Sequence, residues 1–309
     1  MPTDVPDEQL ISAHSARLLA IDPLLGLAPA SPAVDDAWLG GGAAEGLAGV
    51  RTIDEQTLEA VWGKLERFVL KPFWSGDSAA LDALLTEWAA TVRADRRSAD
   101  EDSQVAIAWP SRDLAAARVF LRHGLVPATA LAIRPAGRPT PARPAGELLV
   151  RRAGPDDLEP ILALGAEELA YEEGISVLTV RPGHTDQARA PLAHSLAGES
   201  PWLWVAQSPG GIVGALTLNT VAESTWIADQ TSVESAAYLP LLSVAAEHRA
   251  GGAGSALVAA AHAQLDAAGV GATLLHYGSF NPLSVPFWSR MGYRPLWTYW
   301  EAFPAHHVR

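Results

Sequence analysis

The sequence contains no cysteine in its 309 residues. This absence excludes disulfides, thiolate nucleophiles, and zinc or iron–sulfur sites with cysteine ligands. Basic residues are also scarce, since 22 Lys and Arg stand against 35 Asp and Glu, giving a formal net charge of −13. Nucleic acids and anionic membranes are bound by clustered Lys and Arg, so this balance opposes both as partners and favours a cationic small molecule. A surface whose acidity only maintains solubility explains the balance equally well.

Long apolar runs and targeting signals are missing as well. No window holds 18 uninterrupted apolar residues, which argues against a transmembrane helix. Residues 1–8 include acids where a secretory signal needs basic residues followed by an apolar core. We therefore expect a cytoplasmic protein, and the sequence leaves its oligomeric state open.

The length and composition predict a globular chain of about two domains, since 49% of the residues are apolar and 18% are charged. Residues 134–146 carry four prolines and no apolar periodicity, which is typical of a semi-stiff linker. We accordingly predict a first unit at residues 1–134, a linker at 135–146 and a second unit at 147–309.

The second unit has the element order β-α-α-β-β-β-α-β-α-β. Strands are predicted at residues 147–153, 202–206, 212–218, 237–244, 272–279 and 293–303. Helices are predicted from residue 155 and at 185–197, 252–268 and 284–291. An antiparallel meander followed by a βαβ crossover predicts a mixed, twisted α/β sheet with flanking helices.

The first unit has a less distinct pattern. It predicts helices at residues 7–20, 55–68, 79–93 and 112–123, with strands at 104–109 and 125–133. Its ending, with His123-Gly124-Leu125, parallels Gly292-Tyr293 at the end of the second unit. We therefore predict a duplicated fold whose first copy is degenerate.

A glycine-rich loop at residues 245–252 carries the strongest functional signal. Gly251, Gly252 and Gly254 allow a tight turn and close approach of a ligand, ahead of a helix with unpaired N–H groups and a positive dipole end. This arrangement suits a pyrophosphate. Simple turn chemistry is the competing interpretation. The loop has neither the Gly-Lys-Ser/Thr of a Walker loop nor the glycine spacing of a dinucleotide site.

Two segments resemble the GNAT acyltransferase superfamily. Arg249-x-x-Gly252-x-Gly254 is similar to its Arg/Gln-x-x-Gly-x-Gly/Ala signature, between a strand and a long helix. The stretch from Asn281 to Tyr293 is similar to the Asn-x-x-Ala-x-x-Leu-Tyr-x-x-x-Gly-Phe pattern that ends many of these domains. The resemblance covers about 160 residues and implies a GNAT-like fold with acetyl-CoA as co-substrate, and together with the predicted duplication it implies two tandem GNAT-like lobes.

The resemblance also implies a set of CoA-binding residues. Backbone groups of Leu242, Ser243 and Val244 are expected to pair with the pantetheine arm, which Asn281 would meet from the other side. The remaining residues expected to bind CoA are Arg249, Ala250, Gly251, Gly252, Ala253, Gly254, Ser255 and Trp288. Capping the helix that follows is an equally good role for Asn281, and the two roles can coexist.

The family mechanism is direct attack of an amine on the thioester, which needs alignment, a base and stabilisation of the oxyanion. By position, the Val244 N–H is the expected oxyanion donor. The family's tyrosine near the departing sulfur is replaced by Trp288, whose indole is too weak an acid. Ser284, Tyr277 and Tyr293 are possible substitutes, although Ser284 is favoured as a helix cap, and a thiolate can also leave without a protein acid.

Glu234 and His276 are the expected candidates for the base, since both flank the slot. A solvated loop carboxylate and a structural histidine are the competing interpretations. The acceptor pocket of the family lies by the first two helices, where Glu167, Glu168, Glu172 and Glu173 would attract an amine. Acids at this spacing also mark the solvated face of a helix. We expect Glu168, Glu172 and Glu173 to contact the acceptor.

The predicted function is therefore CoA-dependent transfer of an acetyl group to a primary amine of a small, cationic molecule. The alternative is a non-catalytic CoA-binding or sensing module. No metal is expected. The first unit has Ser75-Gly76-Asp77 where the cradle should be, and the acid would repel a phosphate, so we expect no CoA there.

Overall fold

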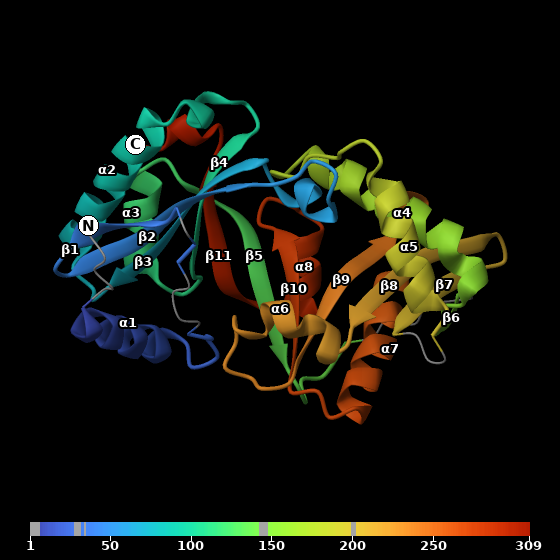
Figure 1. The fold of residues 1–309 in the computed structure, drawn as a ribbon. Helices are drawn as coiled ribbons and strands as arrows, with labels where there is room; N and C mark the ends of the chain where they lie inside the picture. Colours follow the sequence, from blue (N-terminus) through green and yellow to red (C-terminus); the bar gives the residue numbers. More distant parts are fainter. Residues whose placement is uncertain (1–6, 28–31, 34, 142–147, 199–201) are drawn as a thin grey trace.

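One continuous mixed sheet of 11 strands runs through the computed structural model, which describes residues 7–27, 32–33, 35–141, 148–198 and 202–309. The strand order is β1-β2-β3-β4-β11-β5-β10-β9-β8-β7-β6. Figure 1 shows the sheet crossing the whole molecule with helices packed along it. The expected mixed, twisted α/β architecture is confirmed.

The C-terminal half contains the succession predicted for it. Its strands are β6 (Leu149–Arg152), β7 (Leu203–Ser208), β8 (Gly211–Asn219), β9 (Ala236–Val244), β10 (Ala272–Gly278) and β11 (Arg294–Ala302). Its α-helices are α4 (Leu158–Glu173), α5 (His184–Leu196), α6 (Thr225–Ala228), α7 (Ala253–Ala267) and α8 (Ser284–Arg290). Helices α4 and α7 cover opposite faces of the sheet, because Val205 packs with the α4 core and its neighbour Trp204 with the α7 core.

The N-terminal half repeats most of this succession. Its strands are β1 (Ala37–Gly41), β2 (Ala44–Thr52), β3 (Glu66–Trp74), β4 (Ser103–Pro110) and β5 (Val126–Pro135). Its helices are α1 (Glu8–Ile21), the short 3-10 helix η1 (Leu58–Trp62), α2 (Ser78–Ala94) and α3 (Leu114–Arg122). In each half an antiparallel meander leads through a helix to a parallel strand, then a short helix and a last strand. The GNAT-like succession is therefore present twice.

The last strands of the two halves are exchanged. Strand β11 lies between β4 and β5, antiparallel to both, so its two sheet neighbours come from the N-terminal half. Strand β5 lies between β11 and β10 and continues the sheet into the C-terminal half. The halves are thus joined through their own strands, and the exchange has the same form on each side of the β5–β11 pair.

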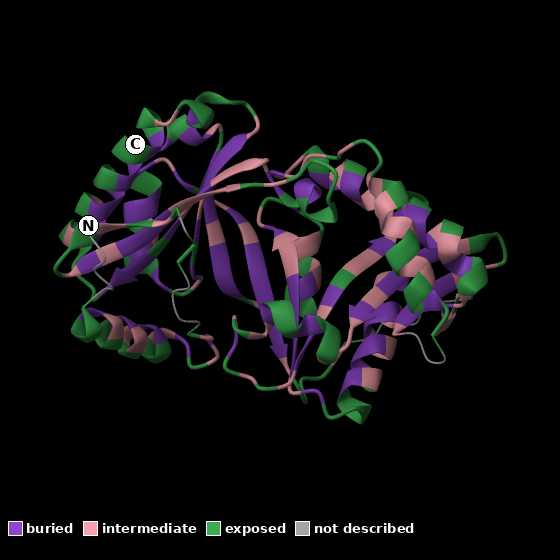
Figure 2. Ribbon diagram, viewed as in Figure 1, coloured by how far each residue is buried: buried purple, intermediate pink, exposed green. Residues whose placement is uncertain are grey.

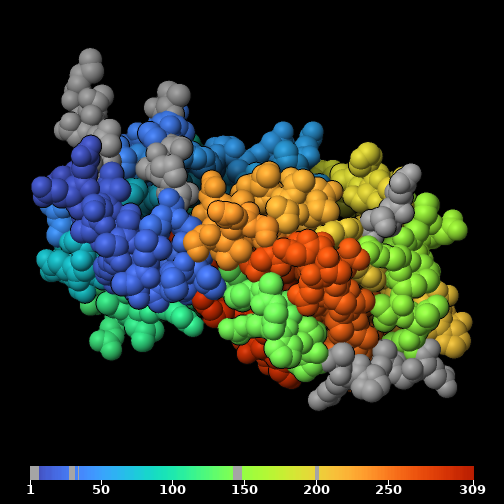
Figure 3. Space-filling model, turned by 90° about the horizontal axis from the view of Figure 1, so that it is seen from below, coloured from blue at the N-terminus to red at the C-terminus, as the bar shows by residue number. Residues whose placement is uncertain are grey.

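The buried core follows this exchange. The largest hydrophobic cluster combines Phe68, Trp88 and Phe120 of the N-terminal half with Leu274 and Trp300 of the C-terminal half. Figure 2 shows the central strands buried along most of their length. On another face, seen in Figure 3, the segment after α1 lies against the loop before β9, where Leu25 pairs with Thr231.

One prediction for the first half is wrong, and one hairpin was missed. Residues 55–68 were expected to form a helix, but only η1 forms before Gly63, and the chain then enters β3. Alternating burial of Phe68 and Leu70 in β3 outweighs the helical spacing, because the strand gains neighbours on both sides. The hairpin β1–β2 was not predicted, although Gly40-Gly41-Gly42 marks its turn.

The predicted linker is partly integrated into the fold. Strand β5 extends to Pro135, and the Thr140 hydroxyl lies 2.6 Å from Nδ1 of His262 on α7. Residues 142–147, which hold the rest of the linker and the predicted start of the second unit, lie outside the described residues. The boundary stays a prediction.

Strand exchange predicts that residues 147–309 do not fold normally alone. In this fragment β11 loses both sheet neighbours and β10 loses β5, which leaves long unpaired edges. We expect the fragment to aggregate or self-associate in size-exclusion chromatography, and to form a 1:1 complex when co-expressed with residues 1–141.

A matched control keeps both halves and cuts only the connection. A protease site inserted within residues 142–146 should yield, after cleavage, one particle that retains the circular dichroism spectrum of the intact chain. A monomeric 147–309 fragment with the thermal transition of the full chain would contradict this account of the fold.

Candidate active site

Strands β9 and β10 separate to form a slot. They pair only where Ala236–Tyr238 face Ala272–Leu274. From Leu239 onward this edge of β9 has no strand partner, and Pro240 has no N–H to offer at the point of separation. A cavity of about 560 Å³ follows the opening, with Leu242, Val244 and Tyr277 in its walls. We call it the donor slot.

The pairing of β9 with β8 determines which backbone N–H and C=O groups of β9 face the donor slot. The Ala245 N–H donates to Val213 O on β8, and backbone groups alternate sides along a strand, so those of Val244 and Leu242 face the slot. Those of Ser243 face β8, and its hydroxyl donates to Leu164 O on α4 at 2.9 Å. The backbone geometry thus fits Leu242 and Val244 to their predicted roles. Ser243 lines the same cavity with its backbone groups turned to β8 and its hydroxyl to α4, and its contact with pantetheine stays a prediction.

The loop before α7 forms a cradle of backbone amides at one end of the slot. Ala250 and Gly252 have φ of 64° and 93°, a left-handed conformation that turns successive N–H groups inward. Among the described residues no side chain caps α7, and Ala253, Gly254 and Ser255 at its N-terminus line the cavity. Such a terminus suits the charge and hydrogen-bonding needs of a pyrophosphate, and these residues fit the predicted group.

Arg249 supports the cradle from behind. Its Nε donates to Val244 O at 3.0 Å, and its guanidinium lies 3.3 Å from the Glu167 carboxylate on α4. The side chain also lies over the Tyr171 ring. Arg249 therefore fixes the loop against β9 and α4. Arg290 and His248, which the sequence analysis did not select, line the slot as additional cations or donors for phosphate.

Asn281 closes the other wall of the slot. Its Oδ1 accepts from the N–H groups of Leu283 and Ser284, and its Nδ2 donates to the Glu172 carboxylate. The expected capping role of Asn281 is present, and its side chain also lines the slot. Ser284 was favoured as the cap, yet Asn281 performs that function, so the Ser284 hydroxyl stays available at the slot wall.

Trp288 touches the slot but belongs mainly to the core. It is buried, and its ring packs edge-on against Phe287 and Tyr293. Tyr293 is also buried, with its hydroxyl 3.0 Å from Nε2 of His262 and away from the slot. Of the three candidate acids, the structure therefore brings Ser284 and Tyr277 to the cavity and not Tyr293.

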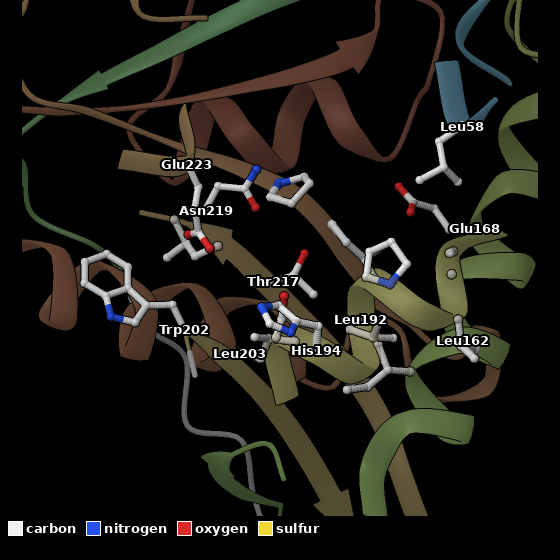
Figure 4. Close-up of a pocket in the computed structure, with 18 of the residues that line it drawn as sticks. Leu58, Leu162, Glu168, Leu192, His194, Trp202, Leu203, Thr217, Asn219 and Glu223 are labelled. Carbon is white, nitrogen blue, oxygen red and sulfur yellow. The ribbon is translucent and has the colours of Figure 1, made fainter. Parts of the chain in front are cut away.

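A second cavity of about 720 Å³ lies between α4, α5 and strands β7 to β9. We call it the acceptor cavity. Figure 4 shows its apolar floor, including Leu192 and Leu203, with Thr217 at the centre. Leu58 and Trp62 of η1 also line it, so the N-terminal half contributes one wall.

Glu168 lies where the two cavities meet, since both are lined by Glu168 and Pro240. Burial and, after it, the nearby Glu172 carboxylate raise the pKa of Glu168 to about 8, and Arg249 opposes the shift. A carboxyl group with this pKa can take a proton near neutral pH and return it to solvent.

The other acids of α4 are engaged elsewhere. Glu167 accepts from the Ala246 N–H and from Arg249. Glu172 is buried against Asn281, and Glu173 accepts from the Val180 N–H without lining either cavity. Of the three predicted acceptor contacts, only Glu168 reaches the acceptor cavity.

The two bases expected from the sequence have different positions. Glu234 is exposed, precedes β9 at the end remote from Val244, and lines neither cavity. His276 lines the slot, but Nδ1 lies 2.9 Å from the Tyr238 hydroxyl and Nε2 lies 3.4 Å from the Tyr299 hydroxyl. Burial lowers the pKa of His276 to about 4 and keeps the ring neutral, in a structural contact with two tyrosines.

The corresponding site in the N-terminal half is filled by protein. Trp74 ends β3 as Val244 ends β9, and its N–H donates to Nδ1 of His14 on α1 at 3.2 Å. Burial lowers the pKa of His14 to about 4, so its ring is neutral and can accept this bond. Asp77 caps α2 through the Ala79 N–H. Side chains of this half thus occupy the backbone groups that the donor slot leaves open.

The described residues contain no group of three or more His, Cys, Asp or Glu side chains arranged to hold a metal ion. Within the same residues, no helix has the length and apolar character needed to cross a membrane.

Comparison with known proteins supports the interpretation of this site. Residues 166–293 match the family model described as Acetyltransferase (GNAT) family. A GCN5-related N-acetyltransferase from Sphaerobacter thermophilus is similar in fold, with a TM-score of 0.53 and 14% identity over 85% of this chain and 77% of that one. No curated protein matches the chain in sequence.

Two further solved structures are similar over more of the chain at lower scores. A GCN5-related N-acetyltransferase from Kribbella flavida has a TM-score of 0.44 and 16% identity, covering 95% of this chain and 93% of that one. A tandem GNAT protein from the clavulanic acid biosynthesis pathway has a TM-score of 0.45 and 13% identity, covering 97% of this chain and 96% of that one.

The family match coincides with the geometry. Residues 166–293 include the open edge of β9, the amide cradle and Asn281, which together fit CoA. The match also assigns the general chemistry, which is acyl transfer that uses acetyl-CoA. Over this domain the chain is similar to the acetyltransferase (GNAT) family.

Proposed function

We propose that the chain transfers an acetyl group from acetyl-CoA to a primary amine of a small, cationic acceptor, with Glu168 as the base. The observation that carries the proposal is the position of Glu168, whose side chain lines both the donor slot and the acceptor cavity. An amine that enters from the acceptor side meets this carboxylate before it meets the thioester.

The protein's part in the reaction is alignment, proton removal and stabilisation of charge. Acetyl-CoA, when bound, supplies the thioester carbonyl. Glu168 accepts one proton of the ammonium, and the resulting amine forms the new N–C bond as the C–S bond breaks to release the thiolate. The second proton lost by the nitrogen passes to the departing thiolate or to solvent. The Val244 N–H, which faces the slot, is placed to stabilise the negative charge that develops on the thioester oxygen.

Protonation of the departing thiolate has two candidate donors in the chain. Ser284 and Tyr277 both line the slot, whereas Trp288 lies at the position where a tyrosine was expected. A thiolate also leaves without a protein acid, so neither hydroxyl is required. Trp288 therefore does not by itself favour a non-catalytic sensor over an enzyme.

Glycine substitutions test the donor slot. Gly254→Asp and Gly252→Asp should each weaken acetyl-CoA binding at least about 100-fold, because a carboxylate would face the pyrophosphate. Gly252 also has a positive φ that other residues adopt with strain. Calorimetry should show about one site per chain before the changes and no detectable binding after them.

Gly254→Ala is the matched control for this experiment. A Cβ at Gly254 would lie 3.5 Å from the Phe287 ring, an ordinary contact that requires no rearrangement. The alanine variant should bind acetyl-CoA normally. If acetyl-CoA still binds to both aspartate variants, the assignment of the donor slot to acetyl-CoA is wrong.

Glu168→Gln tests the base. Because the pKa of Glu168 is raised to about 8, its ionised fraction grows as the pH rises through that value, and kcat/KM for the amine should rise with it. The glutamine variant should lose activity about 100-fold or more and lose this inflection, leaving only the ionisation of the amine.

Glu173→Gln is the control on the same helix, since Glu173 lines neither cavity and glutamine can still accept from the Val180 N–H. It should leave the pH profile unchanged. If Glu168→Gln keeps the wild-type profile and rate, another group is the base. Release of free CoA with any amine above the blank also separates the enzyme from a sensor that only binds CoA.

A further inference from the structure

The lining of the acceptor cavity restricts the chemistry of the acceptor beyond the presence of an amine. Among the described residues that line this cavity there is no Lys or Arg, and burial lowers the pKa of His184, one of the two histidines in that lining. A carboxylate or phosphate on the acceptor would therefore lose water without gaining a permanent counter-charge, which is costly. Its wider walls are apolar, with side chains that include Leu162, Leu192, Trp202, Leu203 and Leu241.

The two carboxylates of the cavity are not equivalent. Glu168 lies at the end shared with the donor slot, whereas Glu223 lies near Asn219, on the opposite side of Thr217 in Figure 4. Glu223 is exposed, and its Oε2 already accepts from the N–H and hydroxyl of Thr220. An ion pair there would be solvated and weak. Only Glu168 offers a sheltered partner for a cation.

The N-terminal half adds an apolar wall at the Glu168 end. Leu58 and Trp62 of η1 line the cavity, yet 37% and 56% of their surfaces are exposed. In the view of Figure 4, Leu58 and Glu168 appear on the same side of the cavity. Two large apolar side chains left partly exposed in the lining provide a surface that the apolar body of an acceptor can cover.

This wall is held firmly against the C-terminal half. Arg181, in the segment between α4 and α5, forms a two-point ion pair with Asp102 at 2.7 and 2.8 Å. Arg181 also donates to Ala60 O, and the Thr179 N–H donates to Val61 O. The position of η1 at the cavity is thus fixed by hydrogen bonds to the segment between α4 and α5.

We propose that the acceptor is an amine with a single cationic centre, placed at Glu168, and an apolar body of about the size of an aromatic ring, placed against Leu58 and Trp62. The acceptor carries no carboxylate or phosphate. This inference rests on the proposed function, and it gives the N-terminal half a direct role in acceptor selection.

A small set of matched amines tests the inference. 2-Phenylethylamine and phenylalanine differ only by a carboxylate, while spermidine adds further cations and glucosamine replaces the apolar body by hydroxyls. We expect kcat/KM to be at least about tenfold higher for phenylethylamine than for the other three. Calorimetry without acetyl-CoA should give the same order of affinity, which provides a readout independent of turnover.

Substitutions of residues that line the acceptor cavity show which wall determines the preference among these amines. Trp62→Ala should raise the KM for phenylethylamine about tenfold and leave the affinity for acetyl-CoA unchanged. Leu121→Ala, another exposed apolar residue of the N-terminal half that lines neither cavity, is the control and should change neither value. Leu192→Arg should shift the ratio of kcat/KM values towards phenylalanine by supplying the missing counter-charge.

The outcomes separate the inference from the function on which it rests. Equal or better use of phenylalanine, spermidine or glucosamine would overturn the inference and leave the acetyltransferase assignment intact. An unchanged KM in Trp62→Ala would overturn the role of the N-terminal wall. If acetyl-CoA binds but phenylethylamine releases no CoA, the inference is overturned, whereas the proposed function fails only if no amine of a broader panel releases CoA.

Discussion

The pairing of β11 with strands of the other half is the constraint on which the rest of the structure depends. Backbone groups of a buried strand must be satisfied, and both ladders that satisfy β11 come from β4 and β5. The same exchange places β5 against β10, one wall of the donor slot. The C-terminal half, which contains the donor slot, therefore relies on the N-terminal half for β5, the strand that pairs with β10.

The two halves have the same succession of strands and helices but differ in what binds the backbone groups at the corresponding strand end and helix terminus. In the C-terminal half, the edge of β9 beyond Tyr238 has no strand partner and the α7 terminus has no side-chain cap. In the N-terminal half, His14 bonds to the end of β3 and Asp77 caps α2. At the strand ends the structural difference between the two halves is that a side chain accepts from the Trp74 N–H, whereas the Val244 N–H faces the donor slot and only the Val244 carbonyl is bound by a side chain, that of Arg249.

Much of the C-terminal half was predictable because its signals are local. Strand alternation, glycines at a strand-helix junction and the Asn281 segment each act within a few residues, and the structure has every predicted element there. The exchange of β5 and β11 was not predictable in this way. Which strands become neighbours depends on contacts between residues more than 150 positions apart in the chain, such as Tyr299 and Thr129.

The acid–base part of the site shows a second limit of sequence reasoning. The sequence directed attention to Glu234 and His276, but Glu234 lies at the wrong end of β9 and His276 is held neutral between two tyrosines. A usable signal was present on α4, where Glu168 and Glu172 continue the helical spacing of the buried residues Ile161 and Leu164. Acids on the apolar face of a helix differ from acids on its solvated face.

Hydrogen exchange with and without acetyl-CoA tests most directly the claim that one half binds CoA and the other supports it. The account predicts slower exchange at the amides of Val244 and residues 249–255 when acetyl-CoA is present, and unchanged exchange at residues 75–79, the corresponding junction of β3 and α2. Protection at residues 75–79, or no protection around Val244 and the α7 terminus, would contradict it.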